Sequence, residues 1–450
     1  MAKIAPFRGY RFNKADVGDL NKVVTQPYDK INDKLRDEYY ARHEYNVVRI
    51  IRGTTQELDN PNDNQYTRAA IHWNQWIEDR ILIREGGPAI YPYFHEYTVE
   101  GNTYLRKGLI ALVCLDDDKA KVRAHEKTLS GPKADRLKLM KATEANDGQI
   151  FMLYDDPENK VNKLMDDDMF GAKPIMEVND DYGAIHRLYR LSRPGLIADI
   201  GEVFEDLELF IADGHHRFET AINYMNYCKA RNWKPMGVET FNYRMMTMVN
   251  MHDPGLTVLP THRVVHSVAG FNPNDFLGKV GVEFEISEFN DRAGLYAALD
   301  EAGKADKSAF GFAANGMNGL RLLKLKDPSM MDRIVGGKHS EAWQRLDVTV
   351  LHSGILERFL GIDAEKLAAE ANIHYVRGRD ETLDMVGRDG SQAAFLLNPT
   401  RVMQVREVAS AGERMPQKST DFFPKLLTGM VMMKMQIDKS AGLALYEKEE

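Results

Sequence analysis

The pattern of hydrophobic and polar positions along this chain predicts short strands alternating with amphipathic helices. Apolar side chains cluster or alternate with polar ones at the predicted strands, and recur every three to four residues at the predicted helices. The strands are expected at 46–51, 90–94, 103–115, 149–154, 207–211 and 393–397, and the helices at 34–43, 67–81, 135–145 and 218–225. This mixture predicts an α+β fold with a mixed sheet.

The length of the chain and its cysteine content limit the number of domains and indicate the cellular compartment. The 450 residues correspond to roughly three domains at about 150 residues each. We expect an N-terminal α/β segment (1–115), a central phosphate-binding core (116–230) and a C-terminal α/β segment (231–450). Cys114 and Cys228 form neither a disulfide framework nor a metal-knuckle spacing, so a reducing, cytoplasmic setting is expected.

The charge and hydropathy of the chain exclude some partners. The net charge of −8 argues against a broad nucleic-acid footprint but leaves room for a local basic pocket. No apolar run reaches membrane-spanning length, and the N-terminus lacks the apolar region of a secretory signal, so we expect no membrane partner. The oligomeric state stays open.

Four polar residues and a glycine form a turn between a predicted strand and a predicted helix. The predicted strand has one strongly apolar face, formed by Leu207, Leu209 and Ile211. The turn that follows consists of Asp213, Gly214, His215, His216 and Arg217. The first N–H groups of a helix lack intrahelical partners, so they bind anions, and the helix dipole adds to this attraction. A glycine lets a ligand approach the backbone closely. We therefore expect a phosphate site, with Asp213 as a metal ligand.

A structural role for this turn is the alternative. Asp213 could cap the helix while the histidines satisfy buried backbone groups. A zinc site is less favoured, because the adjacent His215 and His216 point in different directions and the chain has no HExxH spacing.

A second cluster surrounds His125 and Glu126. Basic residues flank this pair on both sides. A carboxylate among so many cations stays ionised and can serve as a general base toward a hydroxyl. The cations favour a phosphorylated substrate, and a solvated surface cluster is the alternative. The residues are His125, Glu126, Lys127, Thr128 and Arg136, with Lys121, Arg123, Lys133 and Lys138 nearby.

The stretch from Gly412 to Ser419 nearly matches a Walker A loop. Gln417 replaces the second glycine, Pro416 removes a backbone N–H, and Pro424 breaks the helix that should follow. A P-loop nucleoside triphosphatase is therefore rejected. Side-chain contacts to phosphate and a solvated loop stay open as alternatives for Lys418, Ser419, Thr420 and Lys425.

Several of these blocks resemble the signature of domain-of-unknown-function family 1015, a large bacterial and archaeal group. The strongest match is Ile211 to Arg217 (IADGHHR). The other matching blocks follow in the expected order over nearly the whole chain. They are Pro27-Tyr28-Asp29, His125-Glu126-x-Thr128 with Asp135-Arg136, Leu259-Pro260-Thr261-His262-Arg263, and Met415 to Thr420 with Phe423-Pro424-Lys425.

The central segment also resembles the ParB/sulfiredoxin superfamily, whose shared turn cradles nucleotide phosphates. Within it, free-serine kinases carry Asp-Gly-His-His-Arg preceded by a His-Glu pair. The resemblance implies that Glu126 is the base on a serine hydroxyl. Sulfiredoxin has a cysteine where this chain has His215, which excludes sulfinic-acid repair.

The resemblance therefore implies a phosphotransferase acting on free L-serine or a similar small amino acid. Its phosphoryl donor would be ATP, ADP or pyrophosphate, with Mg²⁺ held by Asp213. Glu126, His215, His216 and Arg217 are the expected catalytic residues. The expected phosphate- or substrate-binding residues are His125, Lys127, Thr128, Arg136, Gly214, His262, Arg263, Lys418, Ser419, Thr420 and Lys425.

Two other functions stay open at this point. A phosphatase would use water in place of the serine hydroxyl. A ParB-like nucleotide-binding module would bind without catalysis, although the acidic net charge and the absence of a helix-turn-helix pattern count against DNA binding.

Overall fold

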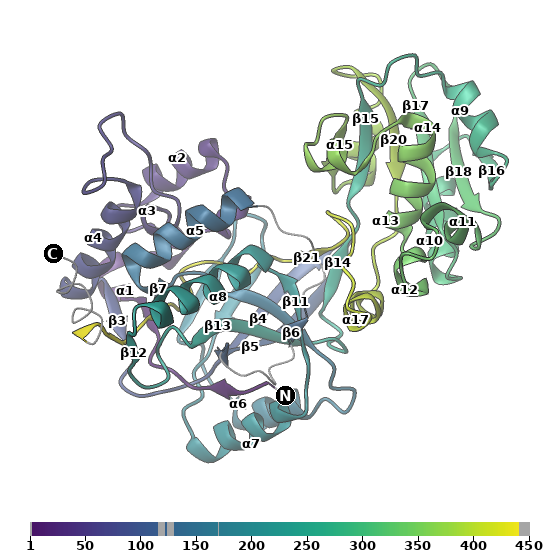
Figure 1. Cartoon of the computed structure of the whole chain (residues 1–450). Coiled ribbons are helices and arrows are strands. Elements are labelled where there is room, and N and C mark those ends of the chain that lie inside the picture. Colours follow the sequence, from purple (N-terminus) through teal and green to yellow (C-terminus); the bar gives the residue numbers. More distant parts are fainter. Residues whose placement is uncertain (1, 116–121, 124–129, 170, 441–450) are drawn as a thin grey trace. The chain divides into compact units, whose positions relative to one another are not determined.

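The computed structural model describes residues 2–115, 122–123, 130–169 and 171–440. These residues form two compact units, which Figure 1 colours along the chain. The first unit contains the described residues up to Leu256 and those from Pro424 onward. The second unit contains residues 257–423, so it is inserted in the sequence of the first.

The first unit is built on a mixed sheet of nine strands. Eight strands follow the order β6-β11-β8-β13-β5-β4-β10-β9, and β1 also pairs with β5. The β6/β11 and β8/β13 pairs are parallel, and the other pairs are antiparallel. The strands of this sheet are β1 (Ile4–Ala5), β4 (Tyr91–Val99), β5 (Asn102–Cys114), β6 (Val122–Arg123), β8 (Ile150–Tyr154), β9 (Met176–Asn179), β10 (Ile185–Leu188), β11 (Leu209–Asp213) and β13 (Tyr243–Asn250).

Helices and short strand pairs surround this sheet. Two helices, α6 and α7, pack on strand residues such as Met152 and Ile211, and α5 packs against α8. The helices are α1 (Lys14–Val17), η1 (Leu20–Lys22), η2 (Tyr28–Lys30), α2 (Asp33–Arg42), α3 (Val48–Ile51), α4 (Gln65–Glu78), α5 (Ser130–Thr143), α6 (Lys160–Met169), α7 (Pro194–Glu205) and α8 (His215–Ala230). The short pairs are β2 (Tyr10–Phe12) with β3 (Leu82–Arg84), β7 (Ala145–Asn146) with β22 (Met433–Lys434), and β12 (Lys234–Pro235) with β23 (Ile437–Asp438).

The second unit has an antiparallel sheet of six strands, in the order β16-β18-β17-β20-β15-β19, and a separate β14/β21 pair. The strands are β14 (Thr257–Leu259), β15 (His262–His266), β16 (Phe284–Phe289), β17 (Ala309–Ala314), β18 (Leu320–Leu325), β19 (Ile373–Val376), β20 (Ser391–Leu396) and β21 (Asp421–Phe423). The helices are α9 (Pro273–Val280), α10 (Arg292–Lys304), α11 (Met330–Val335), α12 (Glu341–Gln344), α13 (Asp347–Thr349), the π-helix η3 (Val350–Glu357), α14 (Arg358–Leu360), α15 (Ala364–Ala368), α16 (Arg379–Asp384) and α17 (Val402–Ser410).

The fold confirms an α+β protein with a mixed sheet. Strands from all three predicted segments join the nine-stranded sheet, so the division at 115 and 230 stays a prediction, as does the ParB/sulfiredoxin-like character of the core. Within the described part of the chain, no helix combines the length and apolar character that crossing a membrane requires.

The predicted strand at 46–51 is wrong. Its apolar side chains are buried, but residues Val48–Ile51 form the short helix α3. The side chain of Asn46 accepts a hydrogen bond from the N–H of Val48 at 2.9 Å and donates to the carbonyl of Lys22 at 2.7 Å. An asparagine that bonds its own backbone two residues on favours a turn over a strand.

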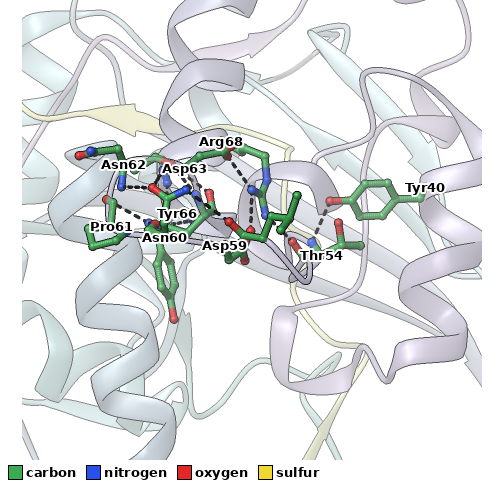
Figure 2. A network of polar contacts seen from close by, with 12 residues as sticks. Tyr40, Thr54, Asp59, Asn60, Pro61, Asn62, Asp63, Tyr66 and Arg68 are labelled. Atoms are coloured by element: carbon green, nitrogen blue, oxygen red, sulfur yellow. Dashed lines mark hydrogen bonds and ion pairs between the residues drawn. The ribbon is translucent and has the colours of Figure 1, made fainter.

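A polar network holds the loop before α4 (Figure 2). Asn64 caps this helix by accepting from the N–H of Tyr66 at 3.0 Å and of Thr67 at 3.2 Å, and Thr67 Oγ1 accepts from the N–H of Asn64 at 2.9 Å. Arg68 donates to Asp63 at 2.7 Å and lies 2.8 Å from Asp59. The start of α4 is therefore fixed by reciprocal bonds, which matters because Tyr66 contacts the functional site described below.

We expect the Asn64→Ala variant to lose about 1 kcal/mol of unfolding free energy, because it removes this helix cap. Urea unfolding followed by the fluorescence of Trp73 and Trp76, both in α4, measures the loss. The matched control is Asn62→Ala, whose side chain lies in the same exposed loop and is not part of the cap. Equal stability of the two variants would contradict the role of the cap.

Candidate functional site

The predicted strand-turn-helix is present in the first unit. Strand β11 ends at Asp213, and α8 begins at His215. Gly214 between them has φ of 96° and ψ of 28°, a left-handed conformation that suits glycine. Because the residue before the helix is a glycine, the N-cap residue of α8 supplies no side-chain cap. The N-terminus of a helix is a suitable place for an anion.

Asp213 is an ionised carboxylate held between cations. Its Oδ2 lies 3.0 Å from Lys425 Nζ, and its Oδ1 lies 3.5 Å from Arg217 Nη2. Burial alone would raise the pKa of Asp213, but the charges of Lys425, Arg217 and Lys30 outweigh it and hold that pKa well below 3.8. Asp213 thus pairs with side chains instead of capping the helix.

Arg217 lies in the first turn of α8 and is almost fully buried. Its Nη1 donates to the carbonyl of Gln149, and its Nη2 lies 3.9 Å from the carboxylate of Asp29. A Cβ added to Gly214 would lie 3.1 Å from Arg217 Nε, so the guanidinium packs directly against the turn. The glycine therefore permits both the backbone conformation and the position of this cation.

We expect Gly214→Ala to displace Arg217 and to weaken phosphate binding. The matched control is Gly183→Ala, since Gly183 has φ of 82° and nothing within 4 Å of an added Cβ. Both variants should lose about 1–2 kcal/mol from left-handed backbone strain. Only Gly214→Ala should weaken the binding of inorganic phosphate measured by calorimetry, and an equal effect of both would contradict the packing argument.

Lys425 reaches Asp213 because its backbone is anchored to the sheet. Thr25 and Thr428 form a β-bridge with N–H to carbonyl distances of 3.1 and 2.9 Å. Arg106 Nη2 donates to the carbonyl of Pro424 at 2.7 Å, and the N–H of Leu427 donates to Tyr93 Oη at 3.2 Å. The bridge therefore places the segment after Pro424 beside the segment that carries Tyr28 and Asp29.

The two histidines of the turn differ in exposure. His215 is buried, and His216 is half-buried. Burial lowers the pKa of His216 below 6.5, so its imidazole is neutral at pH 7. His216 Nδ1 is buried and has no hydrogen-bond partner in the described part of the chain.

Arg136 of α5 is fixed beside Tyr28. Its Nη1 donates to the carbonyl of Ile51 at 2.6 Å, and its Nη2 to Asp135 Oδ2 at 2.5 Å. Asp135 in turn accepts from Tyr66 Oη at 2.8 Å, which ties this pair to α4. The guanidinium lies 4.2 Å from the centre of the Tyr28 ring, and burial raises the pKa of that phenol.

A small cavity of about 40 Å³ lies behind Arg217. Its walls come from α5, α8, the segment 145–148 and the segments that carry Tyr28 and Thr428. Leucine, isoleucine, methionine and alanine side chains form the apolar part. The polar lining residues are Tyr28, Arg136, Asp147, Arg217, Thr220, Arg244 and Thr428.

The remaining predicted site residues fall into two groups. His125, Glu126, Lys127 and Thr128 fall outside the described residues, so the base assignment stays a prediction. His262, Arg263, Lys418, Ser419 and Thr420 belong to the second unit.

Arg263 and Lys418 lie together in that unit. Arg263 is fully buried and donates to the carbonyls of Thr261 and, at 3.1 Å, Lys418. Both cations also approach the ring of Tyr375, at 5.2 and 5.6 Å. Their predicted contact with phosphate stays a prediction.

Five residues at the site were not among the predicted site residues. Tyr28 and Asp29 lie in a block that the family resemblance contained, which was the available signal, and Lys30 directly follows that block. Asp147 and Arg244 line the cavity. Arg244 could have been found as a charged residue directly before the apolar run 245–251. No feature of the hydrophobic pattern distinguishes Asp147.

The carboxylates beside the turn that the structure describes are Asp213 and Asp29. Mg²⁺ usually takes one or two carboxylates and completes its shell with water and substrate phosphates. Carboxylates are the side chains that such an ion prefers, and Mg²⁺ binding by Asp213 stays a prediction. In residues 2–115, 122–123, 130–169 and 171–440, no group of three or more His, Cys, Asp or Glu side chains is arranged to hold a metal.

The fold and the site define an α+β protein with a cationic strand-turn-helix suited to an anion. A family model described as "Protein of unknown function (DUF1015)" matches residues 4–349, and the chain belongs to this family. No curated protein sequence matches the chain.

Several solved structures are distantly similar in fold. A conserved hypothetical protein from Pyrococcus furiosus has 12% identity and a TM-score of 0.32, covering 70% of this chain and 90% of its own. A free serine kinase in complex with AMP has 11% identity and a TM-score of 0.34, covering 70% and 86%. SbnI with C-terminal truncation from Staphylococcus aureus has 9% identity and a TM-score of 0.32, covering 76% and 90%.

Proposed function

We propose that this protein is a phosphotransferase that phosphorylates the hydroxyl of a free small amino acid, with L-serine as the first candidate, on a ParB/sulfiredoxin-like core. The observation that carries the proposal is the cationic cradle at the start of α8. Lys425 and Arg217 meet at Asp213 there, at the N-terminus of a helix whose N-cap residue is a glycine. Such a cradle is suited to a transferring phosphoryl group.

The mechanism assigns one role to each group. The substrate hydroxyl oxygen attacks phosphorus, the bond from phosphorus to the donor's bridging oxygen breaks, and the hydroxyl proton passes to Glu126. Arg217, Lys425 and the N–H groups of α8 stabilise the charge on the transferred oxygens. The neutral His216 can donate a hydrogen bond to the same oxygens. Mg²⁺ held by Asp213 and Asp29 would neutralise phosphate charge when bound.

The donor is a nucleotide or pyrophosphate. A screen of free amino acids against ATP, ADP and pyrophosphate, with Mg²⁺ present, tests the proposal directly. We expect phosphoserine to form with at least one donor. Hydrolysis of phosphoserine without an acceptor would identify a phosphatase instead, and salt-sensitive retention of DNA without turnover would favour a ParB-like binding module.

A further inference from the structure

Arg244 is a buried arginine that forms no ion pair with any side chain the structure describes. It lies in β13 and is 3% exposed. Its Nη1 donates to Asn146 Oδ1 and its Nη2 to the carbonyl of Gly148 at 2.6 Å, while its Nε has no hydrogen-bond partner among the described residues. Burial, assisted by the charge of Arg217, lowers the pKa of Arg244 to about 9, so it is still charged at pH 7.

The cavity behind Arg217 concentrates positive charge. Arg136, Arg217 and Arg244 all line it, and Asp147 is the carboxylate among the described lining residues. Asp147 accepts from Trp73 Nε1 at 2.6 Å, and burial raises its pKa. Buried charges of one sign are costly unless a counter-charge offsets them. Arg136 pairs with Asp135 and Arg217 with Asp213, so Arg244 is the lining cation without a carboxylate in ion-pair range among the described residues.

The size of the cavity limits the ligand. A buried water needs about 10–15 Å³, so about 40 Å³ holds roughly three waters, whereas a cavity that admits a benzene ring measures about 150 Å³. A purine ring does not fit this volume. The carboxylate of a small molecule, together with one neighbouring polar group such as an ammonium, does fit.

We propose that this cavity binds the carboxylate and ammonium groups of the free α-amino acid whose hydroxyl reacts beside Asp213. The assignment rests on the proposed function for the identity of the ligand as the phosphoryl acceptor. Arg217 lines the cavity and also faces Asp213, so it joins the two subsites. A ligand anchored behind it would extend its hydroxyl toward the turn.

Four polar groups of the cavity then have a role. Arg244 and Arg217 pair with the carboxylate, in the manner of charge-assisted hydrogen bonds. Asp147 attracts the ammonium group. Thr220 Oγ1, which is buried and has no hydrogen-bond partner in the part of the chain described, bonds to the carboxylate or the ammonium.

Binding to the unmodified full-length protein tests the ligand chemistry without any need for turnover. We would titrate L-serine, ethanolamine, which lacks the carboxylate, and 3-hydroxypropionate, which lacks the ammonium group. Both analogues should bind about 10- to 100-fold more weakly than L-serine, because each leaves a buried charge unpaired. Equal binding of all three would overturn the proposal.

Two variants locate the subsite. Arg244→Gln should weaken L-serine binding about 10- to 100-fold, and Thr220→Val about 5-fold. Thr220→Val keeps the shape of the side chain and removes a hydroxyl without a partner, so it should fold even if Arg244→Gln does not. The control is Arg193→Gln, at an arginine whose side chain is 63% exposed, which should leave binding unchanged.

The outcomes separate this proposal from the proposed function. Serine binding that depends on Thr220 or Arg244, without any phosphoryl transfer, would support the subsite and reject the kinase. Transfer to serine with an unchanged KM in a folded Thr220→Val or Arg244→Gln variant would support the kinase and reject the subsite. Inorganic phosphate that binds more weakly to Arg244→Gln than to the unmodified protein, with no serine binding, would reassign the cavity to phosphate.

Discussion

The Lys425→Met variant should lose about 10²- to 10³-fold in kcat for phosphoryl transfer. This loss is typical when one preorganised charge that stabilises a reacting oxyanion is removed. The side chain of Lys425 is 9% exposed and lies 3.0 Å from Asp213, so water does not replace its charge. Steady-state kinetics with the donor identified by the screen measures the loss.

The same substitution should also destabilise the fold. Removing one partner of a buried ion pair leaves the other charge buried without compensation. Because Arg217 and Lys30 still face Asp213, we expect the free energy of unfolding to fall by at most about 3 kcal/mol. A carboxylate with a lowered pKa contributes stability that is fully present above about pH 3.8 and is lost as the pH falls through the lowered value. Lys425→Met should therefore raise the pKa of Asp213 and shrink this acid-sensitive contribution.

The matched control for this variant is Lys34→Met, at a lysine in the same unit whose side chain is 87% exposed. It should change neither kcat nor stability by a measurable amount. A Lys425→Met protein that keeps full turnover would remove Lys425 from the mechanism and leave it a structural ion pair.

The Glu126→Gln variant should lose about 10²- to 10⁴-fold in kcat, the usual contribution of a general base. Glutamine keeps the size of the side chain but cannot accept the hydroxyl proton. The acidic limb of the pH–rate profile should disappear with the carboxylate. Unaltered binding of L-serine in the same variant, measured by calorimetry, would show that the loss is chemical.

Glu158→Gln provides the comparison, since the side chain of Glu158 is 71% exposed. Its rate and pH profile should match those of the unmodified protein. Full turnover by Glu126→Gln would contradict the base assignment. Asp29, whose carboxylate lies near Arg217, would then be the next candidate for the base.

The elements that the sequence predicted correctly are those whose local pattern agrees with their tertiary surroundings. The hairpin of β4 and β5 follows two apolar runs around Glu100 and Gly101, both of which have positive φ. Helix α4 has an apolar stripe with Trp73 and Trp76 and an asparagine cap. The error at 46–51 arose because the side chain of Asn46 overrides the β-branched run by bonding the backbone.

The candidate site was predictable only in its local part. Asp213 to Arg217 are consecutive, so spacing and turn chemistry were sufficient to place them on one strand-turn-helix. Lys425 and Asp29 come to this turn through the Thr25–Thr428 bridge, and Arg244 through the pairing of β13 with β8. Such contacts between distant segments have no periodic pattern in the sequence, so propensity and hydrophobic spacing do not predict them.

The insertion of residues 257–423 within the first unit sets the order in which the site is completed during synthesis. Arg217 leaves the ribosome 208 residues before Lys425, since 425 − 217 = 208. At about 5–20 residues per second, roughly 10–40 s pass in which the turn has been synthesised but Lys425 has not. Throughout that interval Tyr93 and Arg106 lack the segment they anchor. The nascent protein is therefore expected to acquire its cationic cradle, and any activity that depends on it, only after the segment that carries Lys425 has been synthesised.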